Sequence, residues 1–250
     1  MKTIALLNEK GGVGKTTSTA TLAHALARRG RAVLAVDLDP QANLTAWLGN
    51  VLPQATVANA LTDYRSTKDA IGSTSATGVD LLYGSREAAD AADELRSSSP
   101  APATALRRAL KAINEPYDFV LLDCPPGVGV LSVNALVAAG TIMVPVDSQA
   151  MALSGLSQLL KTLDELADAE ILSQRPEITV FVTRYDGRLA LAREVRDYLG
   201  DLGVAALFNA TIRVSTRLAE CFGHQKTIYD YAPNEPVAAD YERLAEEIDR

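Results

Sequence analysis

The ten residues from Asn8 to Thr17 constrain this chain more than any other segment. They read Asn-Glu-Lys-Gly-Gly-Val-Gly-Lys-Thr-Thr and lie between an apolar run, residues 3–7, and a helical pattern that begins near Thr16. A glycine-rich turn between a strand and a helix directs backbone N–H groups toward an anion, and the helix N-terminus adds partial positive charge. The segment therefore predicts a phosphate-binding loop after the first strand.

The residues of this loop have expected roles in holding a nucleoside triphosphate. Lys15 can reach the β- and γ-phosphates, and the Thr16 hydroxyl can bind Mg²⁺. Glu9 stands where the strict pattern G-x-x-x-x-G-K-[ST] has its first glycine, and a second lysine, Lys10, lies at the mouth of the loop. The predicted cofactor contacts in the loop are Gly11, Gly12, Val13, Gly14, Lys15, Thr16 and Thr17.

Strand-like runs alternate with helical patterns along the chain. The strand-like runs are residues 3–7, 32–37, 79–82, 118–123, 141–146 and 178–184, and the clearest helical patterns are 16–29, 104–113, 131–139 and 153–169. This alternation implies right-handed βαβ units and a mostly parallel, twisted sheet with helices on both faces. A Ser/Pro-rich stretch, 97–103, is expected to be an exposed loop. We expect one α/β P-loop NTPase domain over residues 1–250.

Acidic residues follow two of the predicted strands. Asp37 and Asp39 close the second run, and Asp123 follows four apolar residues, 119–122. Ligands of parallel sheets bind at the carboxyl ends of the strands, where the glycine-rich loop also lies. A buried strand seldom ends on an acid that lacks a partner, and hydrated Mg²⁺ would supply one.

Composition limits the possible partners and the compartment. The net charge is −7, which argues against a constitutive nucleic-acid binder but not against a local basic patch, because fields decay over about 8 Å at physiological salt. The two cysteines, Cys124 and Cys221, have neither metal-type nor disulfide-framework spacing, and no signal peptide is visible, so we expect a cytoplasmic setting. Residues 124–146 carry no charge, but their prolines and glycines indicate a loop, a buried helix and a buried strand rather than a membrane span.

The loop resembles the deviant Walker A motif of the ParA/MinD superfamily of P-loop ATPases, and more specifically that of the ParA/Soj partition proteins. Further segments match this family in order along the chain: residues 36–43, 117–126, 182–188 and 217–220. The resemblance covers the chain from end to end, apart from a divergent stretch around residues 50–115.

This resemblance implies an ATPase that forms a homodimer around ATP and Mg²⁺. Lys10 would reach across the dimer to phosphates held by the other subunit, which makes phosphoryl transfer conditional on assembly. Asp39 would orient the attacking water, so the expected catalytic set is Lys10, Lys15 and Asp39. The expected metal set is Thr16, Asp37 and Asp123, with Asp37 in the outer shell.

The resemblance also suggests where adenine and DNA bind. Arg184 and Ile212 are expected to line the adenine pocket, and ATP is expected rather than GTP because the guanine-reading Asn-Lys-x-Asp motif is missing. Relatives place DNA-binding arginines and lysines on the C-terminal part of the dimer surface. The candidates here are Arg213, Arg217 and Lys226, with Arg184, Arg188, Arg193 and Arg196 as weaker ones. Residues 212–218 depart from the family pattern, since they lack its proline and the arginine is shifted.

The implied function is that of a nucleoid-associated partition ATPase. Its ATP-bound dimers would coat nonspecific DNA, and a ParB-like partner would stimulate slow hydrolysis to drive plasmid or chromosome segregation. The same switch could instead position a non-DNA cargo over the nucleoid. A MinD-like membrane ATPase would need a basic amphipathic C-terminal helix, whereas residues 241–250 are short and acidic, so no membrane partner is expected. An iron–sulfur reductase would need cluster-binding cysteines, and Cys124 is expected to be a packed residue instead.

Overall fold

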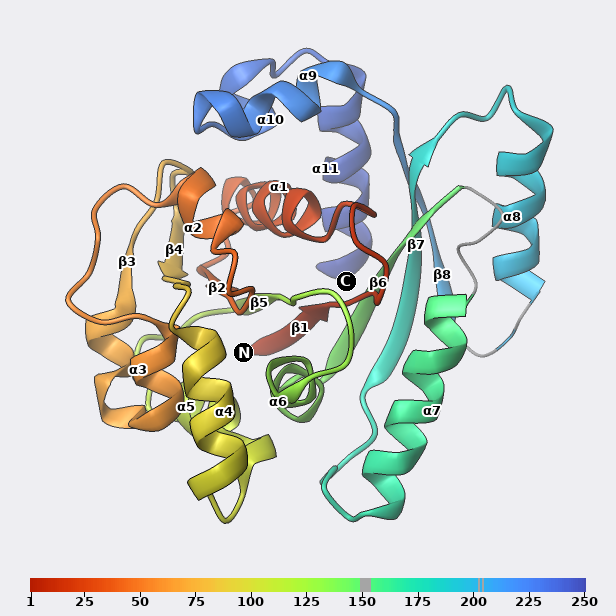
Figure 1. Cartoon of the computed structure of the whole chain (residues 1–250). Coiled ribbons are helices and arrows are strands. Elements are labelled where there is room, and N and C mark those ends of the chain that lie inside the picture. Colours follow the sequence, from red (N-terminus) through yellow and green to blue (C-terminus); the bar gives the residue numbers. More distant parts are fainter. Residues whose placement is uncertain (149–153, 202, 204) are drawn as a thin grey trace.

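The computed structural model describes residues 1–148, 154–201, 203 and 205–250. Its centre is a twisted eight-stranded sheet in the order β3-β4-β2-β5-β1-β6-β7-β8, with helices packed on both faces (Figure 1). All neighbouring strands are parallel except β3 and β4, which are antiparallel. This architecture confirms the predicted α/β class.

The strands are β1 (Lys2–Leu6), β2 (Val33–Asp37), β3 (Ile71–Ser73), β4 (Val79–Leu82), β5 (Phe119–Asp123), β6 (Thr141–Asp147), β7 (Glu177–Tyr185) and β8 (Ala206–Arg213). The α-helices are α1 (Lys15–Arg28), α2 (Asn43–Leu48), α3 (Val57–Thr62), α4 (Ala88–Ser98), α5 (Ala105–Lys111), α6 (Val130–Ala138), α7 (Ser154–Asp168), α8 (Ala190–Asp201), α9 (Thr216–Glu220), α10 (Ile228–Tyr231) and α11 (Pro236–Ile248). Short 3-10 helices are η1 (Tyr64–Ala70), η2 (Pro102–Thr104) and η4 (Cys221–His224).

The sheet separates two hydrophobic cores, and β1 shows why. Side chains of successive strand residues point to opposite faces, so Ile4 and Leu6 pack in one core while Ala5 and Leu7 pack in the other. The core of Ile4 and Leu6 is covered by α1, α2 and α11, and the opposite core by α3 to α8. Because both faces are covered, the central strands are apolar along most of their length, which is why the sequence pattern predicts them.

All six predicted strands are present, but two further strands were missed. β3 has only three residues with a glycine at its centre, and β8 is a half-exposed edge strand in which polar residues interrupt the apolar pattern. Each of the four predicted helices is present to within two residues at the ends, except that residue 153 lies outside the described residues.

The predicted loop at 97–103 is wrong at both ends. α4 continues to Ser98, where the Ser97 hydroxyl donates to carbonyl oxygens of the preceding turn, and η2 begins at Pro102. Residues 124–146 contain α6 and β6, as expected. No helix in the described part of the chain is both long and apolar enough to cross a membrane.

Candidate nucleotide-binding site

The glycine-rich loop connects the carboxyl end of β1 to α1, at the centre of the sheet. Gly12 and Gly14 have φ values of 75° and 92°, in the left-handed region that side chains disfavour. A Cβ atom added at Gly11 or Gly12 would meet no atom within 4 Å. The loop therefore borders open space that a bound anion can fill, and glycine keeps that space free of side chains.

Lys15 begins α1, and its side chain folds back into the loop. Its Nζ donates to the carbonyl oxygens of Asn8 and Lys10, at 3.0 and 3.2 Å. Burial lowers the pKa of Lys15, and the carboxylate of Asp123 partly offsets that effect. Lys10, by contrast, is exposed at the mouth of the loop. The two lysines thus occupy different environments, one inside the loop and one facing solvent.

Two buried carboxylates end the strands beside the loop. Asp37 of β2 and Asp123 of β5 are paired in register, and both side chains are fully buried. Burial raises the pKa of Asp37 to about 6, although hydrogen bonds from Thr45 and Asp39 lower it in part. Burial and the neighbouring Asp37 carboxylate raise the pKa of Asp123 well above its usual range. Two adjacent buried carboxyl groups are unfavourable in their ionised forms unless a cation lies near them.

The surroundings of Asp123 fit a magnesium ion. Its Oδ2 has no hydrogen-bond partner among the described residues, whereas Oδ1 accepts a bond of 3.4 Å from the Thr19 hydroxyl. The Thr16 hydroxyl lies close enough to counter part of the rise in the Asp123 pKa. Mg²⁺ typically binds one or two carboxylates together with substrate phosphates and water. Thr16, Asp37 and Asp123 supply such a donor set beside the phosphate loop.

Asp39 lies two residues beyond the end of β2 and is half-buried. Its backbone N–H donates to Asp37 Oδ1 at 3.2 Å, and its own Oδ1 accepts from the backbone N–H of Gln41 at 2.9 Å. The turn therefore holds the Asp39 carboxylate next to the two buried acids.

A cavity of about 390 Å³ opens on the other side of the loop. Thr183, near the end of β7, links this strand to the loop, because its hydroxyl donates to the Val13 carbonyl at 3.0 Å. Six of the predicted cofactor residues line this cavity: Gly12, Val13, Gly14, Thr17, Arg184 and Ile212. The segment that follows Ile212 lines the cavity as well, through Arg213, Val214, Ser215, Thr216, Leu218 and Ala219. Tyr241 of α11 is the lining residue that no nearby motif indicated.

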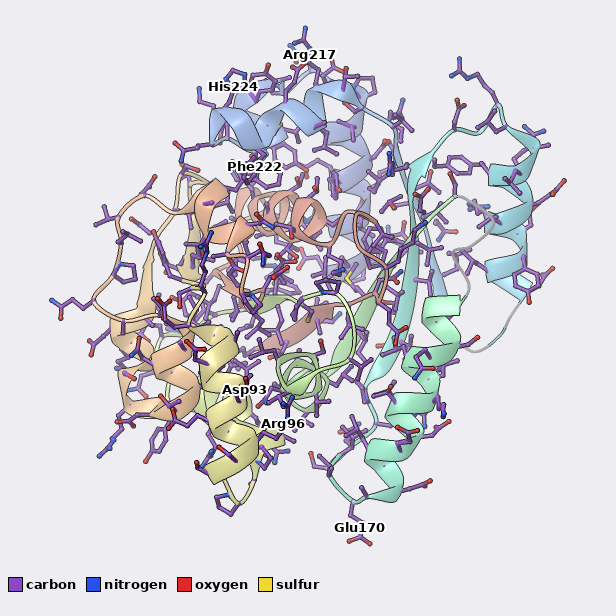
Figure 2. The ribbon with its side chains drawn as sticks, in the orientation of Figure 1. Asp93, Arg96, Glu170, Arg217, Phe222 and His224 are labelled. Carbon is purple, nitrogen blue, oxygen red and sulfur yellow. The ribbon has the colours of Figure 1, made fainter. Side chains whose placement is uncertain are left out.

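The predicted DNA-binding arginines are engaged within the chain. Arg213 forms two hydrogen bonds, of 2.7 and 2.9 Å, with the buried carboxylate of Asp240, which also pairs with Arg243. Arg217 pairs with Glu220 at 2.9 Å. Figure 2 shows Arg217 at the outer edge of the C-terminal helices, pointing away from the sheet. Lys226 is exposed on the segment after η4.

α2 connects the acidic turn to this C-terminal region. The indole N–H of Trp47 donates to the Lys226 carbonyl at 2.9 Å, and its ring meets that of Phe222 edge to face at 5.9 Å. In Figure 2, Phe222 lies on the side of the C-terminal helices that faces the rest of the molecule. Trp47 therefore links α2, the helix that follows Asp39, to the segment that carries Lys226.

Comparisons with known proteins agree with this geometry. The family model described as "AAA domain" matches residues 1–178. The chromosome-partitioning ATPase Soj of Thermus thermophilus is 42% identical over 248 residues, which cover 99% of this chain and 95% of that protein. The sporulation initiation inhibitor protein Soj of Bacillus subtilis is 34% identical, with 99% and 98% covered. This chain belongs to the ParA/Soj family of ATPases.

The ParA/Soj chain also matches solved structures over its full length. Cobyrinic acid a,c-diamide synthase from Mycobacterium smegmatis, crystallised with an ATP analogue and magnesium, superposes with a TM-score of 0.85 at 29% identity, covering 100% of this chain and 95% of that one. The ParA/Soj resemblance of the loop motif is confirmed by the two Soj relatives and the family model. Both cysteines of the ParA/Soj chain are buried, and no three His, Cys, Asp or Glu side chains among the described residues form a metal-binding cluster.

Proposed function

We propose that this chain is an ATP-dependent partition switch. It binds ATP with Mg²⁺, forms a homodimer, binds DNA without sequence preference, and hydrolyses ATP slowly until a ParB-like partner stimulates it. The observation that carries the proposal is the pair of buried carboxylates, Asp37 and Asp123, beside a glycine-rich loop that encloses the Lys15 ammonium. This arrangement matches the needs of a triphosphate and a divalent cation, and the Thermus thermophilus relative is a chromosome-partitioning ATPase.

Each group of the site has a distinct task in this proposal. Bound Mg²⁺, held by Thr16 with Asp37 and Asp123, would neutralise charge on the β- and γ-phosphates. Lys15 binds the same phosphates, and Asp39 accepts a hydrogen bond from the attacking water. The cavity beside Arg184 and Ile212 takes the adenine base. Catalysis of phosphoryl transfer depends mainly on such positioning and charge neutralisation.

Lys10 makes the switch depend on assembly. Its side chain is exposed, while the Lys15 ammonium is bonded to carbonyl oxygens of its own loop. A second cation at the mouth of the loop can therefore bind the phosphates of a facing subunit. Two loops that exchange these lysines would stabilise the dimer only when both nucleotides are present.

DNA binding would follow from dimerisation. Lys226 is exposed, and the side chains of Arg213 and Arg217 are about half exposed despite their acidic partners. Three phosphate contacts per protomer become six in a dimer, and the salt dependence of log K steepens from about −2.7 to about −5.4 at roughly 0.9 per contact. Phosphate contacts position a protein on DNA without specifying sequence.

Gel filtration and DNA retention test these steps together. With ATP and Mg²⁺, Asp39→Ala should bind ATP, hydrolyse it slowly and elute as a dimer that retains two unrelated DNA duplexes equally. Lys15→Ala should bind no nucleotide, and adding Lys10→Ala to Asp39→Ala should restore the monomer. Lys161→Ala, which removes an exposed lysine of α7, is the matched control and should leave the dimer intact. A monomeric Asp39→Ala protein under saturating ATP-Mg²⁺, or wild-type protein without ATP-dependent DNA retention, would contradict the proposal.

A further inference from the structure

The carboxylate of Asp37 contacts the first turn of α2 and the segment after β4, as well as its own turn. Its Oδ2 accepts a hydrogen bond of 2.8 Å from the backbone N–H of Thr45, in the first turn of α2. Residue Ala42, which precedes α2, provides no side-chain cap. Asp37 thus takes the place of a capping residue, since an anion at a helix N-terminus is stabilised by the unpaired N–H groups there.

The hydroxyl of Thr45 forms a second link, to the chain that leaves β4. Its Oγ1 accepts a hydrogen bond of 2.7 Å from the backbone N–H of Gly84. A Cβ atom added at Gly84 would lie 2.6 Å from Asp37 Cγ and 2.8 Å from Oδ2, so this glycine packs directly against the carboxylate. Thr45 therefore restrains the Asp37 carboxylate in two ways. Its backbone N–H bonds the carboxylate directly, and its hydroxyl holds Gly84 against the carboxylate.

We propose that Thr45 is a positioning residue that orients the Asp37 carboxylate toward magnesium through its backbone N–H and through its hydroxyl bond to Gly84. This inference rests on the proposed ATP-Mg²⁺ function. Groups that hydrogen-bond the side chains of a metal site, outer-shell carboxylates included, fix their orientation, and their loss typically weakens metal affinity or activity by 10- to 100-fold. Removing the hydroxyl leaves the Gly84 N–H without its acceptor and frees Gly84 to move away from Asp37.

The test separates binding of the metal from binding of the nucleotide. Wild type, Thr45→Val, Thr45→Ala and Thr45→Ser are titrated with a fluorescent ATP analogue, first in EDTA and then over a range of Mg²⁺ concentrations. Thr45→Val and Thr45→Ala should raise the half-saturating Mg²⁺ concentration about 10-fold or more. Nucleotide affinity in EDTA should stay within about twofold of wild type, and Thr45→Ser should restore the Mg²⁺ response because it keeps the oxygen.

Thr162→Val is the matched control, because it removes a threonine hydroxyl that is bonded within its own helix, α7, far along the chain from Asp37. It should leave the Mg²⁺ dependence unchanged. A Mg²⁺ requirement within twofold of wild type in both Thr45→Val and Thr45→Ala would overturn the role of Thr45, as would an equal loss of affinity in EDTA and in Mg²⁺. Wild-type protein that bound no nucleotide in either condition would instead refute the proposed function itself.

Discussion

The contact between Tyr241 and Ser18 predicts a measurable coupling between the two ends of the chain. The hydroxyls of Tyr241 in α11 and Ser18 in α1 are 3.0 Å apart, and both side chains are buried. Tyr241→Phe removes one partner and leaves the Ser18 hydroxyl buried without it, which should lower the free energy of unfolding by about 1–3 kcal/mol. Ser18→Ala should cost a similar amount, because it isolates the tyrosine hydroxyl.

The double variant distinguishes a true pair from two independent sites. Replacing both partners by apolar groups removes the unsatisfied polar atom, so Tyr241→Phe with Ser18→Ala should be about as stable as either single variant. In urea unfolding followed by circular dichroism, the coupling should be about 1 kcal/mol or more. For a chain of this size each kcal/mol corresponds to roughly 2–4 °C in melting temperature.

Tyr198→Phe is the control, because Tyr198 is 51% exposed on α8 and its change should stay within about 0.5 kcal/mol. If the losses of Tyr241→Phe and Ser18→Ala simply add in the double variant, the two hydroxyls do not interact and the reasoning fails.

Three further perturbations test the fold. Leu34→Ala, in the buried centre of β2, should cost about 2–5 kcal/mol in urea unfolding, and a smaller loss would mean that the core relaxes around the cavity. Gly49→Ala would place a Cβ 2.7 Å from both the Tyr83 ring and the Thr45 carbonyl oxygen and should lower stability by about 1–3 kcal/mol, whereas an unchanged melting temperature would show that both neighbours move aside freely. Burial lowers the pKa of His24, so the unfolded chain gains a proton at higher pH than the native state and stability should fall as the pH drops below about 6.5. His24→Gln should flatten that part of the curve between pH 7 and pH 5, and identical wild-type and variant slopes would exclude His24 as the source.

The sequence predicted the centre of the fold and of the site because both depend on local pattern. Buried parallel strands are continuous apolar runs, and the loop around Lys15 needs glycines whose φ is positive. Asp37 and Asp123 each end such a run, so their meeting at one edge of the sheet follows from strand order once the sheet is parallel. Local sequence marks each of these features, and the pairing of β2 with β5 brings the two acids together.

The contacts that were missed join residues far apart in the chain. The buried carboxylate of Asp240 holds Arg213, and Tyr241 lines the cavity beside the loop although it lies more than 200 residues from Ser18. Residues 241–250 looked like a short acidic tail, yet much of α11 packs into the core that includes α1. A carboxylate in a solvent-facing helix and one buried between arginines look identical in sequence, because only packing distinguishes them.

Trp47 gives the chain a built-in optical reporter. It is the only tryptophan of the sequence, so the indole emission of the unlabelled protein comes from one place, the joint between α2 and the segment that carries Lys226. Any movement that separates these two parts exposes the ring to water and shifts its emission to longer wavelength. Stopped-flow fluorescence of the wild-type chain can therefore measure the rate at which the contact between Trp47 and the Lys226 segment changes after nucleotide is added.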